Sequence, residues 1–236
     1  MLGKRSSPRS NFSFGGDLDT EENRPPGEEY YRLYYRDYAA QNPPRKLTYY
    51  RDLAVCYAPL RAVSALDIGC AFGDFLATLP AEWSRSGIDA NEFAISTAAR
   101  RYPDVSFSQT AGLEFPAPGK FDVVTAFDVL EHISDLDGAL TTIRAALPSD
   151  GALIAVVPVY DGPLGAVVRL LDHDPTHVQK ESRAFWIRSI ERHFTILHYE
   201  GLFRFLVPHT RRYLHAHSAA LAPLSPAILI VARPQS

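Results

Sequence analysis

The chain has 236 residues, of which 46% are apolar, so it is long enough for one α/β domain with a well-filled core. Its formal net charge of −3 gives no overall attraction to nucleic acid or acidic membranes, and no apolar run reaches the roughly 18 residues of a membrane span. Two cysteines, Cys56 and Cys70, are too few for a disulfide framework and favour a reducing, cytoplasmic setting.

The N-terminal part of the chain is predicted to be a tail followed by a helical cap. Residues 1–27 are polar and interrupted by glycine and proline, which is typical of a disordered tail, and they lack the apolar segment of a secretion signal. The predicted cap, 28–61, opens with five tyrosines that recur every four residues, and it continues in a second helix over 45–57. Tyr31 and Tyr35 are the expected contacts if this aromatic row covers a ligand, and packing on the core is the alternative.

Beyond the cap, short apolar strands alternate with amphipathic helices, which predicts a parallel sheet with crossover helices. The expected strands are 64–69, 85–89, 105–109, 121–127, 151–158, 195–203 and 227–233. The expected helices lie near 73–80, 91–102, 135–147 and 182–192. Ser134 and Ser182 are the predicted N-caps of the last two.

A glycine-rich turn, in the segment LDIGCAFGDFL, follows the first predicted strand. Gly69, Ala71 and Gly73 stand at every second position, and such a turn lets a ligand approach the main chain closely. A dinucleotide motif would require its third glycine where Asp74 stands, and an acid there opposes close packing and repels a pyrophosphate. An uncharged or cationic nucleoside such as S-adenosylmethionine fits better, and a nicotinamide cofactor remains the alternative.

Asp89 ends the second predicted strand, 22 residues after Asp67. A carboxylate there can accept hydrogen bonds from both hydroxyls of a ribose, worth roughly 1.5–3 kcal/mol each. This acid alone is compatible with either cofactor, so the glycine turn decides between them.

Residues 62–160 resemble the class I S-adenosylmethionine-dependent methyltransferases of the small-molecule branch. The family's motif acid-x-Gly-x-Gly-x-Gly reads Asp67-Ile-Gly69-Cys-Ala71-Phe-Gly73, with alanine at the middle glycine, and FDVVTAFDVLEHISD closely matches the fourth motif. The resemblance implies an α/β fold with a Rossmann-like, seven-stranded, mostly parallel sheet, helices on both faces, an antiparallel last strand and an N-terminal helical lid. The domain is expected over 62–236, with 159–181 and 204–226 as insert or lid segments.

The resemblance also implies the activity and the cofactor site. A methyl group would pass from S-adenosylmethionine, leaving S-adenosylhomocysteine, to O, N or C of a small organic acceptor, such as one from specialised metabolism. The predicted cofactor set is Asp67, Gly69, Ala71, Gly73, Asp89, Ala90, Gln109, Thr110, Ala111, Phe127, Asp128 and His132. No metal ligands are predicted.

His132 is the first candidate for the acceptor side. Methyl transfer mainly requires the nucleophile to be held roughly 3–3.5 Å from the methyl group, with a base only for poorly acidic acceptors. If a helix begins at Asp128, residues 128 and 132 share one face at the end of the fourth strand. Glu131 has capping-box spacing from Asp128 and is interpreted as structural.

His177 is the second candidate. It belongs to the segment Asp174-Pro-Thr176-His177, which recurs in the resembling branch ahead of a Ser-x-x-x-Trp segment, here ending in Trp186. A near-neutral pKa would let this imidazole take a proton from an acceptor hydroxyl. The alternative is that His177 bonds to Asp174 or to the backbone and shapes its loop, while Trp186 is expected in the core.

A basic cluster near the C-terminus is interpreted as a solvated helix face, with an anion-binding site as the alternative. Its members are Arg204, Arg211, Arg212, His209, His215 and His217.

Without a dense basic stripe, no nucleic-acid partner is expected, nor a membrane partner, and the chain is expected to be a monomer or homodimer. Competing functions are methylation of protein or RNA, a non-catalytic cofactor-binding module, and a nicotinamide oxidoreductase.

Overall fold

The computed structural model describes residues 27–29, 38–61, 63–110, 119–172, 174, 176–206 and 212–235. Several predictions fall outside these residues: nearly all of the predicted tail, Tyr31, Tyr35, Ala111, His209 and Arg211. Within the described part of the chain, no helix is both long and apolar enough to cross a bilayer.

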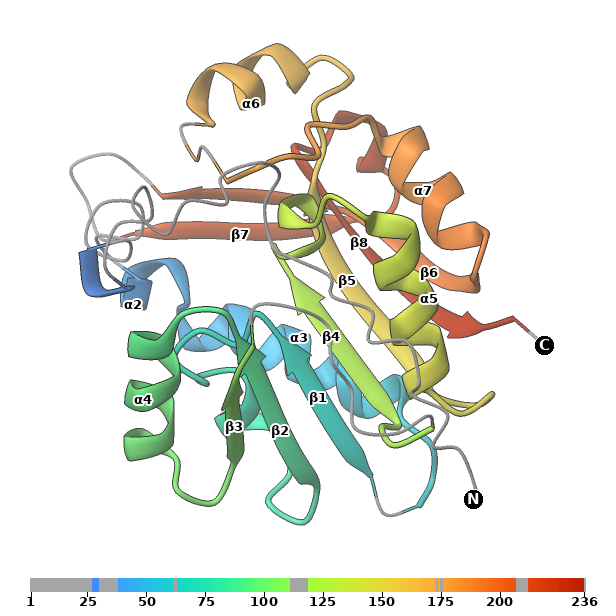
Figure 1. Ribbon diagram of the computed structural model, residues 1–236. Coiled ribbons are helices and arrows are strands. Elements are labelled where there is room, and N and C mark those ends of the chain that lie inside the picture. The colour runs from blue at the N-terminus through green and yellow to red at the C-terminus, as the bar shows by residue number, and fades with distance from the viewer. Residues whose placement is uncertain are drawn as a thin grey trace, which may run out of the picture.

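One eight-stranded sheet, in the order β3-β2-β1-β4-β5-β8-β6-β7, organises the molecule (Figure 1). The strands are β1 Ser64–Ile68, β2 Ser84–Asp89, β3 Ser106–Gln109, β4 Val123–Phe127, β5 Ala152–Pro158, β6 Phe194–Leu206, β7 Tyr213–Ser218 and β8 Ala227–Pro234. The first five are mutually parallel, and β8 runs antiparallel between β5 and β6. The predicted Rossmann-like sheet and its antiparallel last strand are confirmed.

The strand count of seven is wrong, because β7 adds an eighth strand at the edge. It pairs antiparallel with the end of β6, from Gly201 opposite Ser218 to Leu206 opposite Tyr213. An edge strand buries few side chains, and in β7 only His215 is buried. The segment therefore lacks the apolar pattern that predicted the other strands.

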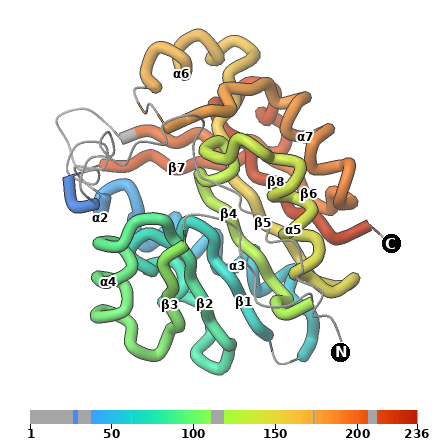
Figure 2. Tube along the Cα trace, viewed as in Figure 1, coloured from blue at the N-terminus to red at the C-terminus, as the bar shows by residue number. Residues whose placement is uncertain are grey.

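Helices cover both faces of the sheet, as predicted. The α-helices are α2 Tyr38–Gln41, α3 Pro44–Tyr57, α4 Glu92–Arg101, α5 Leu136–Ala146, α6 Gly165–Leu171 and α7 Arg183–Glu191. Leu140 on α5 and Trp186 on α7 belong to the core cluster on one face, and Tyr50 on α3 belongs to the cluster on the other. Figures 1 and 2 show α5 and α7 in front of the sheet and α3 behind it. Trp186 is fully buried, as predicted, and its Nε1 donates to the Pro158 carbonyl at 3.0 Å.

Some local predictions are corrected by the structure. The helix expected near 73–80 is only the 3-10 turn η2, Leu76–Thr78, and α6 forms within a segment expected to be a loop. Ser182 caps α7 as predicted, whereas the N-cap of α5 is Asp135 rather than Ser134. The carboxylate of Asp135 accepts from the Gly138 amide at 2.9 Å, which places the first turn one residue later.

No α-helix begins at Asp128. Its φ of 57° lies in the left-handed region, which cannot start a right-handed helix, and only the 3-10 turn η3, Leu130–His132, follows. The cap position of η3 makes no side-chain bond, so the predicted capping box is wrong as well.

Candidate active site

The glycine turn directly follows the carboxyl end of β1. The amides of Gly69 and Cys70 both donate to the Ile88 carbonyl, at 2.8 and 3.0 Å, which holds the turn against β2. Gly69, Ala71 and Gly73 have φ values of 68°, 47° and 77°. Three left-handed residues at alternate positions fold the main chain into a compact cradle at the strand ends, where ligands of open α/β sheets bind.

Asp89 at the end of β2 bonds to this cradle. One carboxylate oxygen accepts from the Ala71 amide at 2.9 Å and the other from the Asn91 amide at 2.8 Å. Burial raises the pKa of Asp89, and these amide bonds oppose that rise. Asp89 thus lies where a sugar seated on the turn would meet a carboxylate.

The end of β3 lies beside β2 in register, with Gln109 opposite Asp89. The Thr110 amide donates to the Asp89 carbonyl at 3.0 Å, and Gln109 Nε2 donates to the Ala90 carbonyl at 3.2 Å. The residues predicted to bind the cofactor at the ends of β1, β2 and β3 therefore lie together at the carboxyl ends of these parallel strands.

Asp67 lies below the turn and is only 4% exposed. Thr125 Oγ1 donates to its carboxylate at 2.5 Å. Burial raises the pKa of Asp67 to about 7, although the Thr125 bond opposes the rise, and the nearby charge of Asp89 adds to it.

This shifted pKa predicts a pH-dependent stability that Asp67→Asn removes. Because the folded-state pKa of about 7 lies above the unfolded value of about 3.9, folding of the wild type becomes less favourable as the pH rises between those values. We expect the unfolding free energy of Asp67→Asn, relative to wild type, to grow by about 1–3 kcal/mol from pH 4 to pH 8. Urea unfolding at both pH values measures this, with the exposed Glu82→Gln as control. A difference that does not change with pH would contradict it.

Tyr38 lies beside the turn, although the sequence singled out Tyr31 and Tyr35 from the same tyrosine row. Its ring meets the Phe72 ring edge-on, with centroids 4.8 Å apart. Burial raises the pKa of Tyr38, and the charges of Asp74 and Asp67 add to this. Helix α2 therefore places an aromatic side chain next to the glycine turn and the carboxylates near it.

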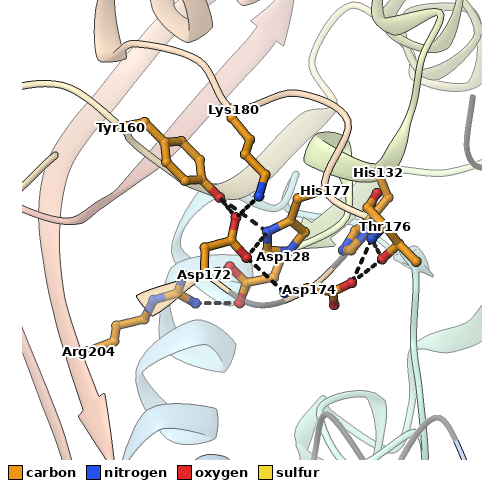
Figure 3. A network of polar contacts seen from close by, with 9 residues as sticks. All are labelled: Asp128, His132, Tyr160, Asp172, Asp174, Thr176, His177, Lys180 and Arg204. Atoms are coloured by element: carbon orange, nitrogen blue, oxygen red, sulfur yellow. Dashed lines mark hydrogen bonds and ion pairs between the residues drawn. The ribbon is translucent and has the colours of Figure 1, made fainter. Parts of the chain in front are cut away.

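His132 is held on the other side of the site by a loop residue. Its Nδ1 lies 2.9 Å from Thr176 Oγ1 and 3.2 Å from the Thr176 carbonyl (Figure 3). Thr176 Oγ1 itself donates to Asp174 at 2.5 Å, so it accepts from His132, and the proton of that ring is on Nδ1. Burial lowers the pKa of His132, and a charge on His177 would lower it further.

The His177 ring is oriented by Asp172, while the His177 backbone amide donates to the Asp174 carbonyl at 3.4 Å, a bond of the kind that the loop-shaping alternative expected. Its Nδ1 lies 2.9 Å from Asp172 Oδ1 and 3.1 Å from the Tyr160 hydroxyl. Tyr160 and Lys180 both donate to Asp172 Oδ2, at 2.7 and 2.8 Å. Burial alone would raise the pKa of Asp172, but the bonds from Lys180, Tyr160 and His177 outweigh it and lower that pKa.

The two imidazoles therefore face one another in defined tautomers. The ring centroids of His132 and His177 are 4.7 Å apart in an edge-to-face arrangement. Since each Nδ1–H is engaged, each ring has only Nε2 left as an acceptor or ligand atom.

Glu131 is a member of the site that its capping-box spacing concealed. It is 1% exposed, and its backbone carbonyl accepts from the amides of Val178 and Gln179 at 3.0 and 2.9 Å. Its Oε2 has no hydrogen-bond partner among the described residues. Burial raises the pKa of Glu131 well above its ordinary value, and the charge of Asp128 adds to the rise.

Asp128 is held by Arg204 in a two-pronged ion pair. Arg204 Nη2 lies 2.6 Å from Asp128 Oδ1, and Arg204 Nη1 bonds the second oxygen (Figure 3). Burial opposes ionisation of Asp128, but the charge and bonds of Arg204 prevail and lower the pKa of Asp128. Arg204 lies on β6, so the interpretation of the basic cluster as a solvated helix face is wrong.

Other members of that cluster pack at the β6–β7 edge. His217 Nδ1 lies 3.0 Å from Glu200 Oε2, and burial together with the charge of Lys46 lowers the pKa of His215 to about 4. Lys46, itself buried, has its pKa lowered to about 8 by burial and by Arg204. His215 and His217 thus pack beside α3, where both rings contact Tyr49.

Comparisons with known proteins agree with this geometry. Residues 66–153 match a family model described as a methyltransferase domain. The chain is 25% identical over 156 residues to trans-aconitate 2-methyltransferase of Afipia carboxidovorans, covering 64% of this chain and 60% of that protein. It is 32% identical over 129 residues to ubiquinone biosynthesis O-methyltransferase of Methylobacterium nodulans, covering 48% and 51%. The chain thus spans little more than half the length of these curated relatives.

Solved structures share the fold. The YcgJ protein of Bacillus subtilis superposes with a TM-score of 0.59 at 16% identity, covering 80% of this chain and 98% of that one. The N-methyltransferase NodS of Bradyrhizobium japonicum gives 0.57 at 20% identity, covering 81% and 96%.

Proposed function

Residues 66–153 match a methyltransferase-domain model, and on that premise we propose that the chain methylates an O, N or C atom of a small organic acceptor with S-adenosylmethionine. The observation that carries the proposal is the left-handed turn at Gly69–Gly73, held against β2 with Asp89 bonded to it. The bound cofactor would supply an activated methyl group on a sulfonium, and the protein would bind and orient it.

The residues present fit such a cofactor. A side chain on Gly69 would lie 2.3 Å from Val129 Cγ2, so only glycine lets the turn pack this closely against the segment after β4. Asp67, Asp74 and Asp89 lie close enough to raise the pKa of Tyr38 together, and acids gathered near the turn suit a cation and would repel a pyrophosphate.

In this proposal the cofactor residues take distinct parts. Asp89 would bind the ribose hydroxyls, the turn residues would lie against the nucleoside, and Ala90, Gln109 and Thr110 would border the adenine. Phe127, Asp128 and His132 would border the methionine end. Two curated relatives support a small acceptor, because their names specify trans-aconitate and ubiquinone biosynthesis.

We propose that His132 and His177 face the acceptor with Nε2. Each lone pair can accept a hydrogen bond or a proton from an acceptor hydroxyl, while Asp172 and Thr176 hold the opposite ring atoms. Holding an acceptor in line with the methyl group needs fixed side chains, and both rings are fixed by their Nδ1 bonds.

The change His177→Ala tests this arrangement. We expect turnover to fall at least tenfold while the dissociation constant for S-adenosylmethionine changes less than twofold, because the acceptor side alone is altered. Turnover is measured on an acceptor found in a panel of small hydroxylated, amino and carboxylic compounds, and cofactor affinity by calorimetry. His193→Ala, whose ring bonds Asp137 away from the site, is the matched control. Equal losses in both quantities, or none, would contradict the assignment.

The panel also tests the proposed function. We expect methyl transfer to at least one member. Cofactor binding without transfer to any small compound, but with transfer to protein or RNA, would overturn the small-acceptor proposal. Binding of NADH in place of S-adenosylmethionine would overturn the activity itself.

A further inference from the structure

Three ligand-bearing side chains converge where η3 meets the loop before α7, and we propose that they hold one divalent transition-metal cation. They are Glu131, His132 and His177, and one ligand atom from each lies within 4.8 Å of the other two. Ligand atoms of a tetrahedral zinc lie roughly 3.4 Å apart, so side-chain rotations that move these atoms by about 1 Å complete the site. Figure 3 shows the two imidazoles turned toward one another.

Both histidines are prepared as ligands. A metal-binding imidazole usually donates its second N–H to a carboxylate or carbonyl, which fixes the tautomer and the ring plane. His177 Nδ1 is 2.9 Å from Asp172, and His132 Nδ1 is 3.2 Å from the Thr176 carbonyl and 2.9 Å from Thr176 Oγ1. Nε2 is therefore the free ligand atom of each ring.

Glu131 supplies the anionic ligand. Its side chain is buried and its Oε2 has no hydrogen-bond partner in the described part of the chain, an arrangement that costs free energy unless a cation or donor fills it. The neighbouring acids are already neutralised, since Asp128 pairs with Arg204 and Asp172 with Lys180. Glu131 Oε2 is thus bonded to no described side chain, and its carboxyl group would give up any proton on binding a cation.

The backbone holds the three ligands in position. The Glu131 carbonyl accepts from the amides of Val178 and Gln179, the two residues after His177. Gln179 Nε2 also donates to the Ile133 and Ser134 carbonyls, at 3.2 Å each. The loop ligand is therefore tied to the same turn that carries the other two.

The donor set indicates the class of metal. Two imidazoles and one carboxylate suit zinc, cobalt, iron or manganese, whereas magnesium and calcium prefer oxygen ligands throughout. Three protein ligands leave a coordination position open, as in catalytic zinc sites. Cation binding itself goes beyond the proposed methyl transfer. A bound cation would occupy both Nε2 lone pairs, so an acceptor oxygen would then coordinate the open position instead of bonding the two rings, and that step alone rests on the proposed function.

Cobalt(II) titration of the chelator-treated full chain tests the site without any assay of activity. We expect one equivalent of Co²⁺ to bind with a visible absorption spectrum, displaceable by Zn²⁺, and to raise the melting temperature. Glu131→Gln, which keeps the shape of the side chain and removes its charge, should weaken binding at least tenfold, as should His177→Gln. His193→Ala removes a histidine elsewhere and should leave the spectrum and stoichiometry unchanged.

The outcomes separate this proposal from the proposed function. Absence of a one-equivalent Co²⁺ spectrum, or an unchanged affinity in folded Glu131→Gln and His177→Gln, overturns the metal site even where methyl transfer is found. If Glu131→Gln fails to fold, as circular dichroism would show, the loop variant His177→Gln decides. Metal binding without methyl transfer would retain the site and overturn the activity.

Discussion

Gly69→Ala is expected to lower the unfolding free energy by about 2–5 kcal/mol. Two costs combine: the left-handed φ of 68° is unfavourable for alanine by about 1–2 kcal/mol, and overpacking costs about 1–3 kcal/mol more. The added Cβ would lie 2.3 Å from Val129 Cγ2, and Val129 is 5% exposed, so this side chain has little space to move. Urea unfolding measures the loss, and cofactor affinity should fall with it because the cradle is displaced.

Gly119→Ala is the matched control for this prediction. Gly119 also has a left-handed φ, 63°, but no atom lies within 4 Å of an added Cβ. Its cost should therefore be the backbone penalty alone, about 1 kcal/mol, with cofactor affinity unchanged. Equal losses in the two variants would show that the close approach at the turn is not what requires glycine there.

Asp89→Ala is expected to weaken binding of S-adenosylmethionine at least a hundredfold. The change removes a carboxylate that could accept two ribose hydroxyls, and hydrogen bonds to a charged group contribute roughly 1.5–3 kcal/mol each. The same side chain bonds the Ala71 amide, so the turn also loses one of its bonds to β2, while the bonds from Gly69 and Cys70 to the Ile88 carbonyl remain. The variant should still fold, because the end of β2 is also held by the apolar side chain of Ile88, which is buried in the core.

Glu92→Ala removes the same charge three positions away on an exposed surface and should leave cofactor affinity within twofold of wild type. Calorimetry with S-adenosylmethionine gives both affinities, and circular dichroism shows whether each variant is folded. A folded Asp89→Ala protein that binds as tightly as Glu92→Ala would exclude the carboxylate from the cofactor site.

The parallel core of the fold could be predicted from the sequence because burial on both faces leaves a clear apolar pattern. β5 is buried at every position, and its predicted limits, 151–158, differ from Ala152–Pro158 by one residue. The recognition of a class I methyltransferase rested on the turn and on FDVVTAFDVLEHISD, which both lie within residues 66–153, and it is confirmed.

Elements that depend on tertiary contacts could not be predicted in the same way. β7 forms because the end of β6 offers it a partner, and its mostly exposed side chains leave no periodic signal. The helix expected after the glycine turn is shortened to the 3-10 turn η2. In α6 the side chain of Leu170 is 74% exposed, so the apolar residues of this helix do not mark a buried face and gave no amphipathic signal.

The candidate site shows the same division. Asp67, Gly69 and Asp89 were identified because their spacing is local to a strand and its turn. The partners of the acceptor side come from distant segments: Arg204 reaches Asp128 across 76 positions, and Thr176 reaches His132 across 44. Glu131 was interpreted as structural because sequence spacing cannot show that its carboxylate is buried without a partner.

A crystal structure of the chain with S-adenosylhomocysteine tests the central claim most directly. The account predicts the nucleoside against the main chain of residues 69–73, with both ribose hydroxyls within hydrogen-bond distance, roughly 2.6–3.2 Å, of the Asp89 carboxylate. A nucleoside bound elsewhere, or a ribose that makes no contact with Asp89, would contradict it.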